Sequence, residues 1–315
     1  MDESAWRRHR LANRLQSVLL LAFMAAYLAL LGELLWGRAG LVALSLSLLP
    51  LLFLNPAARP EWLVRLYGAR PLHPDETPGL FAANEILAER AGLPAPPRLY
   101  LLDSPLVNAF STGRREDSVV VLSRGLLELL DRRQLVAVLA HEISHIRADD
   151  TWVMGIADLF ARLTSAFSLV GQMLLLVNLP LVLLHRVPID WFAIALLVAA
   201  PTLSALAQLG LSRTREYDAD LNAVRLTGDP EALVSALAKI DRYSGALLEQ
   251  LLWPGKGLPE PSWLRTHPPT EERIRRIRAL EGRDLPPPIG VPSMKFHLPD
   301  GRGHRPRWRP GGLWY

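Results

Sequence analysis

The sequence predicts a mainly α-helical integral membrane protein with a small α+β domain and about four transmembrane helices in two pairs. Of its 315 residues, 50% are hydrophobic, and the mean hydropathy is positive at +0.16. Several long apolar runs with almost no charge alternate with polar segments. A soluble chain of this length would hold one or two domains, but an apolar run of about 20 residues matches the thickness of a bilayer.

The first pair of predicted transmembrane helices lies at the N-terminus. Residues 15–36 are long enough to span a bilayer and carry one charge, Glu33, whereas residues 39–55 are shorter and contain Pro50. A basic start before an apolar run also fits a secretory signal peptide. The run is too long for one and no small-residue cleavage site follows, so we expect residues 1–57 to form an uncleaved anchor.

The second pair covers residues 163–184 and 189–211, which together make a membrane hairpin over 163–211. Both runs are long enough to span. They contain three polar amides that would be costly against lipid: Gln172, Asn178 and Gln208. A buried hairpin of soluble helices, or a pair lying partly in the membrane interface, is therefore the alternative interpretation.

The arginines predict the orientation of these helices. Arginines cluster before the first run and in the long segments 56–162 and 212–315, whereas the short loops carry only Arg38 and Arg186. By the positive-inside rule, both termini and both long segments are expected on the cytoplasmic side. The net charge of +4 then needs no nucleic acid partner to explain it. Cysteine is absent, which excludes a disulfide framework.

A compact domain is expected from residues 58–162, completed by residues 212–283. Its predicted elements are a helix over 76–93, strands over 98–102, 106–110 and 118–122, a polar turn over 112–117, and a helix that starts at 126–131 and leads into the next one. An exposed sheet edge can bind an extended peptide through main-chain hydrogen bonds. The strand at residue 108 or the strand at residue 119 would be that edge, and simple core β-structure is the alternative for both.

Residues 141–145 are His-Glu-Ile-Ser-His. On a helix His141 and His145 lie one turn apart on one face, so both imidazoles can reach one metal ion. Glu142 projects from the neighbouring face and can reach a water molecule on the open side of the metal. This arrangement is typical of the helical half of a zinc peptidase site. A surface helix carrying the pattern by chance is disfavoured because its other residues are apolar on nearly every side.

Two histidines leave zinc short of protein ligands, so a third must come from elsewhere. The best candidate is the polar stretch 212–220, Ser-Arg-Thr-Arg-Glu-Tyr-Asp-Ala-Asp, which continues with helical periodicity. Glu216 and Asp220 share a face, so Glu216 can bind the metal while Asp220 accepts the ring N–H of a ligating histidine. The alternative is a solvated charged helix with ordinary surface ion pairs.

Four motifs in this order resemble the HtpX family of membrane-bound zinc metalloproteases. They are Asn-Ala-Phe-Ser-Thr-Gly at 108–113, Leu-Ala-His-Glu-Ile-Ser-His at 139–145, the stretch at 212–220, and Thr-His-Pro-Pro-Thr-Glu-Glu-Arg at 266–273. The resemblance covers the chain from the N-terminal helices to about residue 280, and it implies a zincin-type catalytic domain with one zinc ion per chain.

The resemblance also implies roles for individual residues. By similarity, His141, His145 and Glu216 are the zinc ligands, Glu142 is the catalytic base, and Asp220 supports a histidine, as in thermolysin-type peptidases. Those enzymes bind the substrate backbone with an Asn-Ala strand, a role that falls to Asn108 and Ala109 here. After the second histidine the family has a short polar stretch that often includes an asparagine. Asp150 matches that stretch, whereas Ala148 departs from it.

His267 has two interpretations. A histidine near the zinc can stabilise the oxyanion that forms during peptide hydrolysis. Alternatively, residues 266–269 only start a helix that runs to about residue 280, with Glu271 and Glu272 in the first turn where the helix dipole favours them.

The implied function is an endopeptidase of a bacterial inner membrane that cuts misfolded or damaged membrane proteins on the cytoplasmic side. Polypeptide substrates and membrane lipid are its implied partners, and the oligomeric state does not follow from the sequence. An intramembrane protease is excluded because the charged residues on either side leave only about 13 residues for the metal helix, too few to cross. A catalytically silent scaffold and a CAAX-prenyl-type protease are the remaining alternatives. Residues 284–315 are rich in proline, glycine and arginine and are expected to be disordered.

Overall fold

The computed structural model describes residues 3–53, 60–183, 190–251, 270–279 and 285–290. These residues form two compact units, one within residues 56–151 and 215–315 and the other within residues 2–55 and 152–214. We call them the catalytic unit and the membrane unit, after the roles that the sequence leads us to expect for them. The division after the metal helix lies at Thr151 rather than at the predicted residue 162, because the next helix starts at Asp150 and its residues from Trp152 onward belong to the membrane unit.

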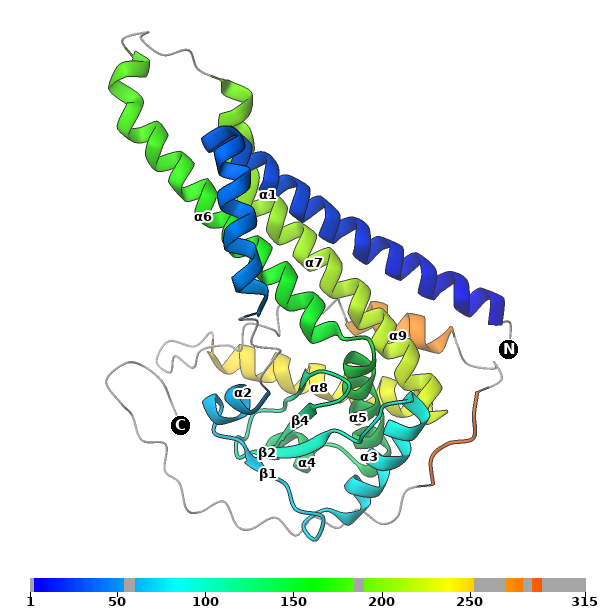
Figure 1. Ribbon diagram of the computed structural model, residues 1–315. Coiled ribbons are helices and arrows are strands. Elements are labelled where there is room, and N and C mark those ends of the chain that lie inside the picture. The colour runs from blue at the N-terminus through cyan, green and yellow to red at the C-terminus, as the bar shows by residue number, and fades with distance from the viewer. Residues whose placement is uncertain (1–2, 54–59, 184–189, 252–269, 280–284, 291–315) are drawn as a thin grey trace. The chain divides into compact units, whose positions relative to one another are not determined.

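The membrane unit consists of α1 (Glu3–Phe53), most of α6 (Asp150–Leu183) and most of α7 (Trp191–Thr227) (Figure 1). Stretches long and apolar enough to span a membrane cover Leu11–Val42, Asp150–Pro180 and Trp191–Thr227. Helix α1 breaks at Gly37, whose positive φ of 57° favours glycine, and then continues as helix to Phe53. The predicted run at 39–55 is therefore helical as far as Phe53, while its count as a fourth span stays a prediction.

Several polar side chains within this unit have hydrogen-bond partners. Gln172 donates to Ser168 Oγ at 2.9 Å, and Ser168 in turn donates to the Leu197 carbonyl at 2.6 Å. Asn178 donates to the Leu174 carbonyl at 2.8 Å. An unpaired polar group costs several kcal/mol in hydrocarbon, so these bonds lower the cost that two of the three amides would otherwise impose on a spanning helix.

The catalytic unit contains a four-stranded sheet of order β1-β2-β4-β3. Its strands are β1 (Arg70–Pro71), β2 (Arg98–Leu102), β3 (Ala109–Gly113) and β4 (Ser118–Ser123). Strands β2 and β4 are parallel, and β1 and β3 are each antiparallel to their neighbour. Strand β3 is thus an edge strand and β4 a central one. Of the two edge candidates, the strand next to Asn108 is the correct one.

Helices cover both faces of this sheet. On one face, buried residues of β2 and β4 pack against α3 (Pro78–Ala91) and α5 (Arg132–Arg147), with α8 (Pro230–Leu251) and α9 (Thr270–Arg278) completing the same core. On the other face Val119 and Val121 pack against Val64 of α2 (Pro60–Leu66). Helix α5 is buried along most of its length, as its apolar sequence predicts.

Two predicted elements need correction, and one short strand was missed. The strand expected at 106–110 starts at Ala109 and runs to Gly113, because the N–H of the preceding residue, Asn108, bonds to the side chain of Ser123, the N-cap of α4 (Arg124–Leu129), and not to a backbone carbonyl of β4. The short strand β1 was not predicted, since two residues carry no alternation. The helix expected to lead from 126–131 into the metal helix is interrupted at Leu130, whose backbone is extended.

A capping box starts the metal helix. The Asp131 side chain accepts from the Gln134 N–H at 3.1 Å, and the Gln134 side chain accepts from the Asp131 N–H at 3.0 Å. We expect Asp131→Ala to lower the free energy of unfolding by about 1 kcal/mol, the usual loss of an N-cap. Chemical unfolding of the detergent-solubilised protein measures this, with the exposed Asp75→Ala as control. Equal stability of the two variants would contradict the capping role.

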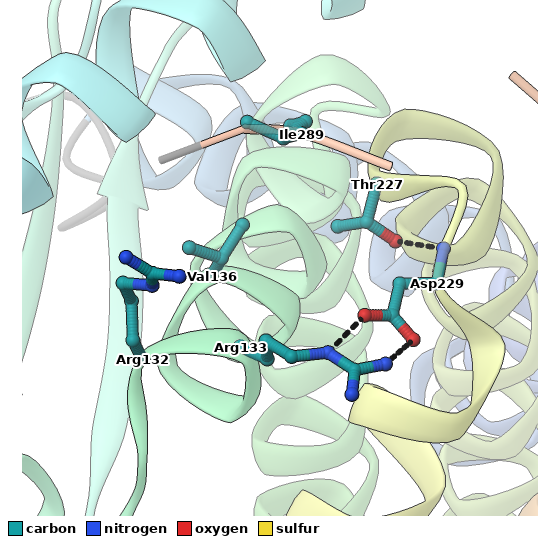
Figure 2. Close-up of a pocket in the computed structure, with 6 residues that line it drawn as sticks. All are labelled: Arg132, Arg133, Val136, Thr227, Asp229 and Ile289. Carbon is teal, nitrogen blue, oxygen red and sulfur yellow. Dashed lines mark hydrogen bonds and ion pairs between the residues drawn. The ribbon is translucent and has the colours of Figure 1, made fainter. Parts of the chain in front are cut away.

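The expected disorder of the C-terminal segment is wrong for residues 285–290. Leu285 and Ile289 pack against the core of the catalytic unit, and the Ile289 N–H donates to the Thr227 carbonyl at 3.3 Å. Figure 2 shows Ile289 over a small pocket that Arg132, Arg133, Val136, Thr227 and Asp229 also line. These two apolar side chains, which lie among prolines, hold this part of the C-terminal segment against the catalytic unit. Residues 284 and 291–315 lie outside the described residues.

Candidate metal centre

Helix α5 brings its two histidines together. His141 and His145 lie one turn apart, and their Nε2 atoms are 3.1 Å from each other. His141 is buried at 7% exposure and the His145 side chain is 15% exposed. Both Nε2 atoms therefore converge on one point beside the helix, as the spacing predicts.

Helix α7 supplies a carboxylate at the same point. Glu216 Oε2 lies 3.5 Å from His141 Nε2, and Glu216 Oε1 lies 3.5 Å from His145 Nε2. Among the described residues, these three side chains form the group that could hold a metal ion. An ion bound tetrahedrally at about 2.1 Å has ligand atoms about 3.4 Å apart. The two Nε2 atoms are 3.1 Å apart, and with one Glu216 oxygen the three ligand atoms lie within 4.8 Å of one another, so the residues present match a metal site.

Each histidine has a carboxylate on its other ring nitrogen. Asp220 Oδ1 lies 3.1 Å from His141 Nδ1, the partnership that the spacing of Glu216 and Asp220 predicts. Asp150 Oδ2 lies 2.8 Å from His145 Nδ1, a partnership that the sequence did not predict. A carboxylate at Nδ1 keeps the proton there and leaves Nε2 free to bind a metal.

These carboxylates also determine the electrostatics of the site. Burial alone would lower the pKa of His141, but hydrogen bonds and charge from Asp220 and Glu216 outweigh it and raise that pKa to about 10. The pKa of His145 is raised in the same way, with burial opposed by the hydrogen bond to Asp150. The buried carboxylates thus stabilise positive charge at the two rings, and a site that binds a cation needs this electrostatic preference.

Arg273 of α9 completes the buried cluster. Its Nε and Nη2 donate to Asp220 at 2.7 and 2.6 Å, and its Nη1 lies 3.3 Å from Glu216 Oε2. Burial raises the pKa of Asp220, but the charge of Arg273 outweighs this and lowers it. Arg273 therefore keeps Asp220 ionised and fixes the carboxylate that orients His141.

Of the other predicted site residues, three lie in the described part of the chain and one does not. Glu142 is 8% exposed and lies between the two histidines in sequence, on the next face of α5. Asn108 directly precedes edge strand β3, and Ala109 is its first residue. His267 lies outside the described residues, so both interpretations of it stay open.

Three site residues escaped the sequence analysis: Asp150, Arg215 and Arg273. Asp150 and Arg273 both belong to stretches that resemble the HtpX family, and that resemblance was the available signal. Arg215 directly precedes Glu216 and donates to Asp150 Oδ1 at 2.9 Å. In the sequence it belongs only to the alternative of a solvated charged helix with surface ion pairs, yet its side chain is only 14% exposed.

The sequence pattern of Peptidase family M48 matches residues 74–281. A curated relative called Protease HtpX homolog, from Desulfatibacillum aliphaticivorans, is 31% identical over 312 residues, which cover 90% of this chain and 93% of the relative. A relative of the same name from Pyrococcus furiosus is 34% identical over 83% of this chain and 94% of its own length. Among solved structures, the crystal structure of S. mikatae Ste24p matches with a TM-score of 0.47 and 21% identity, over 86% of this chain and 66% of that one.

Proposed function

The chain belongs to Peptidase family M48 and is an HtpX-like membrane metalloprotease; on this premise we propose that it is a zinc endopeptidase that cuts misfolded or damaged membrane proteins on the cytoplasmic side of a bacterial inner membrane. One observation carries the proposal above all others. Glu142 lies between two histidines whose Nε2 atoms converge with the Glu216 carboxylate on one point where a metal ion could bind. This complete set of groups gives no support to a catalytically silent scaffold.

The chemistry of the ligands supports zinc as the metal. Two neutral imidazoles and one carboxylate are a usual set for catalytic zinc, which keeps its fourth position open. Zinc, if bound there, would lower the pKa of a water molecule to about 7 and polarise the peptide carbonyl. Carboxylates at both Nδ1 atoms keep the rings in the tautomer that this set requires.

Glu142 acts as the general base in this proposal. It takes a proton from the attacking water and then delivers that proton to the leaving amine. His141, His145 and Glu216 would hold the metal, and Asp220, fixed by Arg273, keeps His141 oriented.

Edge strand β3 provides a place for the substrate. Its outer edge has no neighbouring strand among the described residues, so an extended peptide can add to it by main-chain hydrogen bonds. The Asn108 backbone is anchored on both sides, by its N–H to Ser123 Oγ at 2.8 Å and by its carbonyl to the Ser123 N–H at 2.9 Å. Its side-chain oxygen is buried without a hydrogen-bond partner among the described residues, and a substrate N–H would supply one.

We expect Asn108→Ala to raise KM by roughly 2- to 10-fold with little change in kcat, the effect of losing one hydrogen bond that forms in ground state and transition state alike. Steady-state kinetics with a fluorescent peptide measures both constants. Asn178→Ala in the membrane unit is the control, since its amide bonds to the Leu174 carbonyl. A lower kcat at unchanged KM would contradict substrate binding by Asn108.

The orientation can be tested because the chain contains no cysteine. Arg38 follows the break in α1 and Ala95 belongs to the catalytic unit, and both are exposed. In intact spheroplasts, an impermeant maleimide should label Arg38→Cys, and it should label Ala95→Cys only after the membrane is opened. The reverse pattern would contradict catalysis on the cytoplasmic side.

Reconstituted protein tests the substrate class. Proteoliposomes contain the enzyme together with a target membrane protein. Cleavage is compared between the folded target and a variant of it that a core mutation destabilises. We expect zinc-dependent cleavage of the destabilised target and little cleavage of the folded one, because only an unfolded segment can add to β3 as an extended strand. Equal cleavage of both would contradict the proposed preference.

A further inference from the structure

His145 belongs to a buried chain of three side chains. Its Nδ1 lies 2.8 Å from Asp150 Oδ2, and Asp150 Oδ1 accepts from Arg215 Nη1 at 2.9 Å. The other ligating histidine is held by a chain of the same composition, His141 to Asp220 to Arg273. Each histidine of the metal site thus has its own carboxylate, and each carboxylate its own arginine.

A turn of the backbone brings Asp150 to His145. In a continuous helix residues five apart do not share a face. Here α5 ends at Arg147, and Asp149 adopts a positive φ of 55°, which few residues other than glycine tolerate. Arg115 secures this turn through its ion pair with Asp149 at 3.3 Å and its hydrogen bond to the Arg147 carbonyl. The chain then restarts as α6 with Asp150 as its first residue, 4% exposed.

The second partner of Asp150 comes from the helix of the third ligand. Arg215 directly precedes Glu216 in α7, so the residue that holds Asp150 and the residue that binds the metal are neighbours in one helix. A buried carboxylate is costly unless it is paired and hydrogen-bonded. Asp150 is paired at both oxygens, which fixes its plane and therefore the direction in which it accepts the His145 ring proton.

We propose that Asp150, held in place by Arg215, is a positioning residue that orients His145 for metal binding in the zinc site of the proposed function, on which this inference rests. The competing explanation is that Asp150 only stabilises the N-terminus of α6 as an acidic residue of the first turn, and that Arg215 only pairs with it. Both explanations place the residues identically. They differ in whether zinc affinity changes when the contact is removed.

The test measures zinc affinity directly. Chelator-stripped protein competes with a fluorescent zinc chelator, and cleavage is not part of the readout. We expect Asp150→Ala to weaken zinc binding by roughly 10- to 100-fold, as loss of a carboxylate behind a ligating histidine does. Asp150→Asn should lie between Asp150→Ala and wild type, because an amide oxygen still accepts the ring proton. Arg215→Gln should weaken binding less than Asp150→Ala, and Arg215→Lys less still.

A double variant tests whether Arg215 acts through Asp150. If it does, Asp150→Ala with Arg215→Gln should bind zinc no more weakly than Asp150→Ala alone. Additive losses would overturn the role assigned to Arg215. Should Asp150→Ala fail to fold, the two Arg215 variants and Asp150→Asn still decide the question.

A matched control comes from an ion pair elsewhere in the same unit. Arg133 donates to both oxygens of Asp229 at 2.8 Å, as Figure 2 shows, and neither residue contacts the metal site. Arg133→Gln should leave zinc affinity unchanged. A purely structural role for Asp150 would lower the melting temperature of stripped and zinc-loaded protein equally, whereas the positioning role also reduces the rise in melting temperature that zinc produces.

Two results would overturn the proposal: zinc affinity of Asp150→Ala equal to wild type, or a loss no larger than that of Arg133→Gln. Failure of the proposed function looks different. In that case wild-type protein would bind one zinc without cutting any peptide, while the affinity ranking of the Asp150 and Arg215 variants would still hold.

Discussion

Replacing Glu142 with glutamine should lower kcat/KM for peptide cleavage by roughly 10²- to 10⁴-fold, the range that removal of a general base produces. Glutamine has nearly the size and shape of glutamate but cannot take a proton at neutral pH. Because Glu142 is not among the three side chains that converge on the metal position, zinc content should stay unchanged. Metal analysis and steady-state kinetics on the same preparation measure both quantities.

Glu128→Gln is a suitable control for this variant, since it makes the same chemical change in α4, away from the metal ligands. It should cut as fast as wild type. If Glu142→Gln retains wild-type kcat/KM at full zinc occupancy, Glu142 is not the base. If it loses zinc together with activity, its role is in metal binding rather than in proton transfer.

The second large effect is expected from Glu216→Ala. This change removes one of three protein ligands and leaves Arg273 beside the site without the Glu216 carboxylate, which lies 3.3 Å from its Nη1. Zinc should therefore bind too weakly to survive dialysis, and cleavage should disappear with it. Elemental analysis after dialysis measures the metal. Retention of one zinc per chain would contradict the assignment of Glu216 as a ligand.

Asp218→Ala provides the comparison for Glu216→Ala. It removes a carboxylate of the same helix two residues away, and Asp218 is not among the residues that converge on the metal position. Its zinc content should match wild type. An equal loss in both variants would indicate that the charge of α7, rather than a metal–ligand bond, holds the ion.

The candidate metal ligands were predictable from the sequence because their geometry is local. His141 and His145 lie one turn apart on any helix, and so do Glu216 and Asp220. Only the meeting of α5 and α7 had to be assumed, and the structure brings Glu216 within 3.5 Å of both rings. The edge strand next to Asn108 was only partly predictable. The sequence left two strands as candidates for the sheet edge, and the sheet order shows that β3 is at the edge.

Apart from Asp220, the residues that support the candidate ligands were not predictable in the same way. Arg273 meets Asp220 across 53 residues, and Arg215 meets Asp150 across 65. Spacing says nothing about such contacts, and an arginine in a charged stretch is usually solvated. The positive φ of Asp149 is likewise invisible in a stretch of four polar and small residues, although it brings Asp150 to His145.

The predictions of secondary structure and disorder were wrong where tertiary contacts override the local sequence pattern. The strand predicted from residue 106 starts three residues later, at Ala109, because the Asn108 N–H bonds to the Ser123 side chain rather than to a backbone carbonyl of the sheet. Residues 285–290 have the composition of a disordered tail, yet Leu285 and Ile289 bury apolar surface against the catalytic unit. Composition describes the average of a segment, whereas a few side chains decide whether it packs.

Stepwise return of zinc to chelator-stripped wild-type protein tests the zinc endopeptidase assignment most directly. Cleavage of an unfolded protein is followed after each addition. We expect activity to rise in proportion to added zinc and to level off at one zinc per chain, because His141, His145 and Glu216 form one site among the described residues. Cleavage that persists in the stripped protein, or one zinc bound per chain with no cleavage, would contradict it.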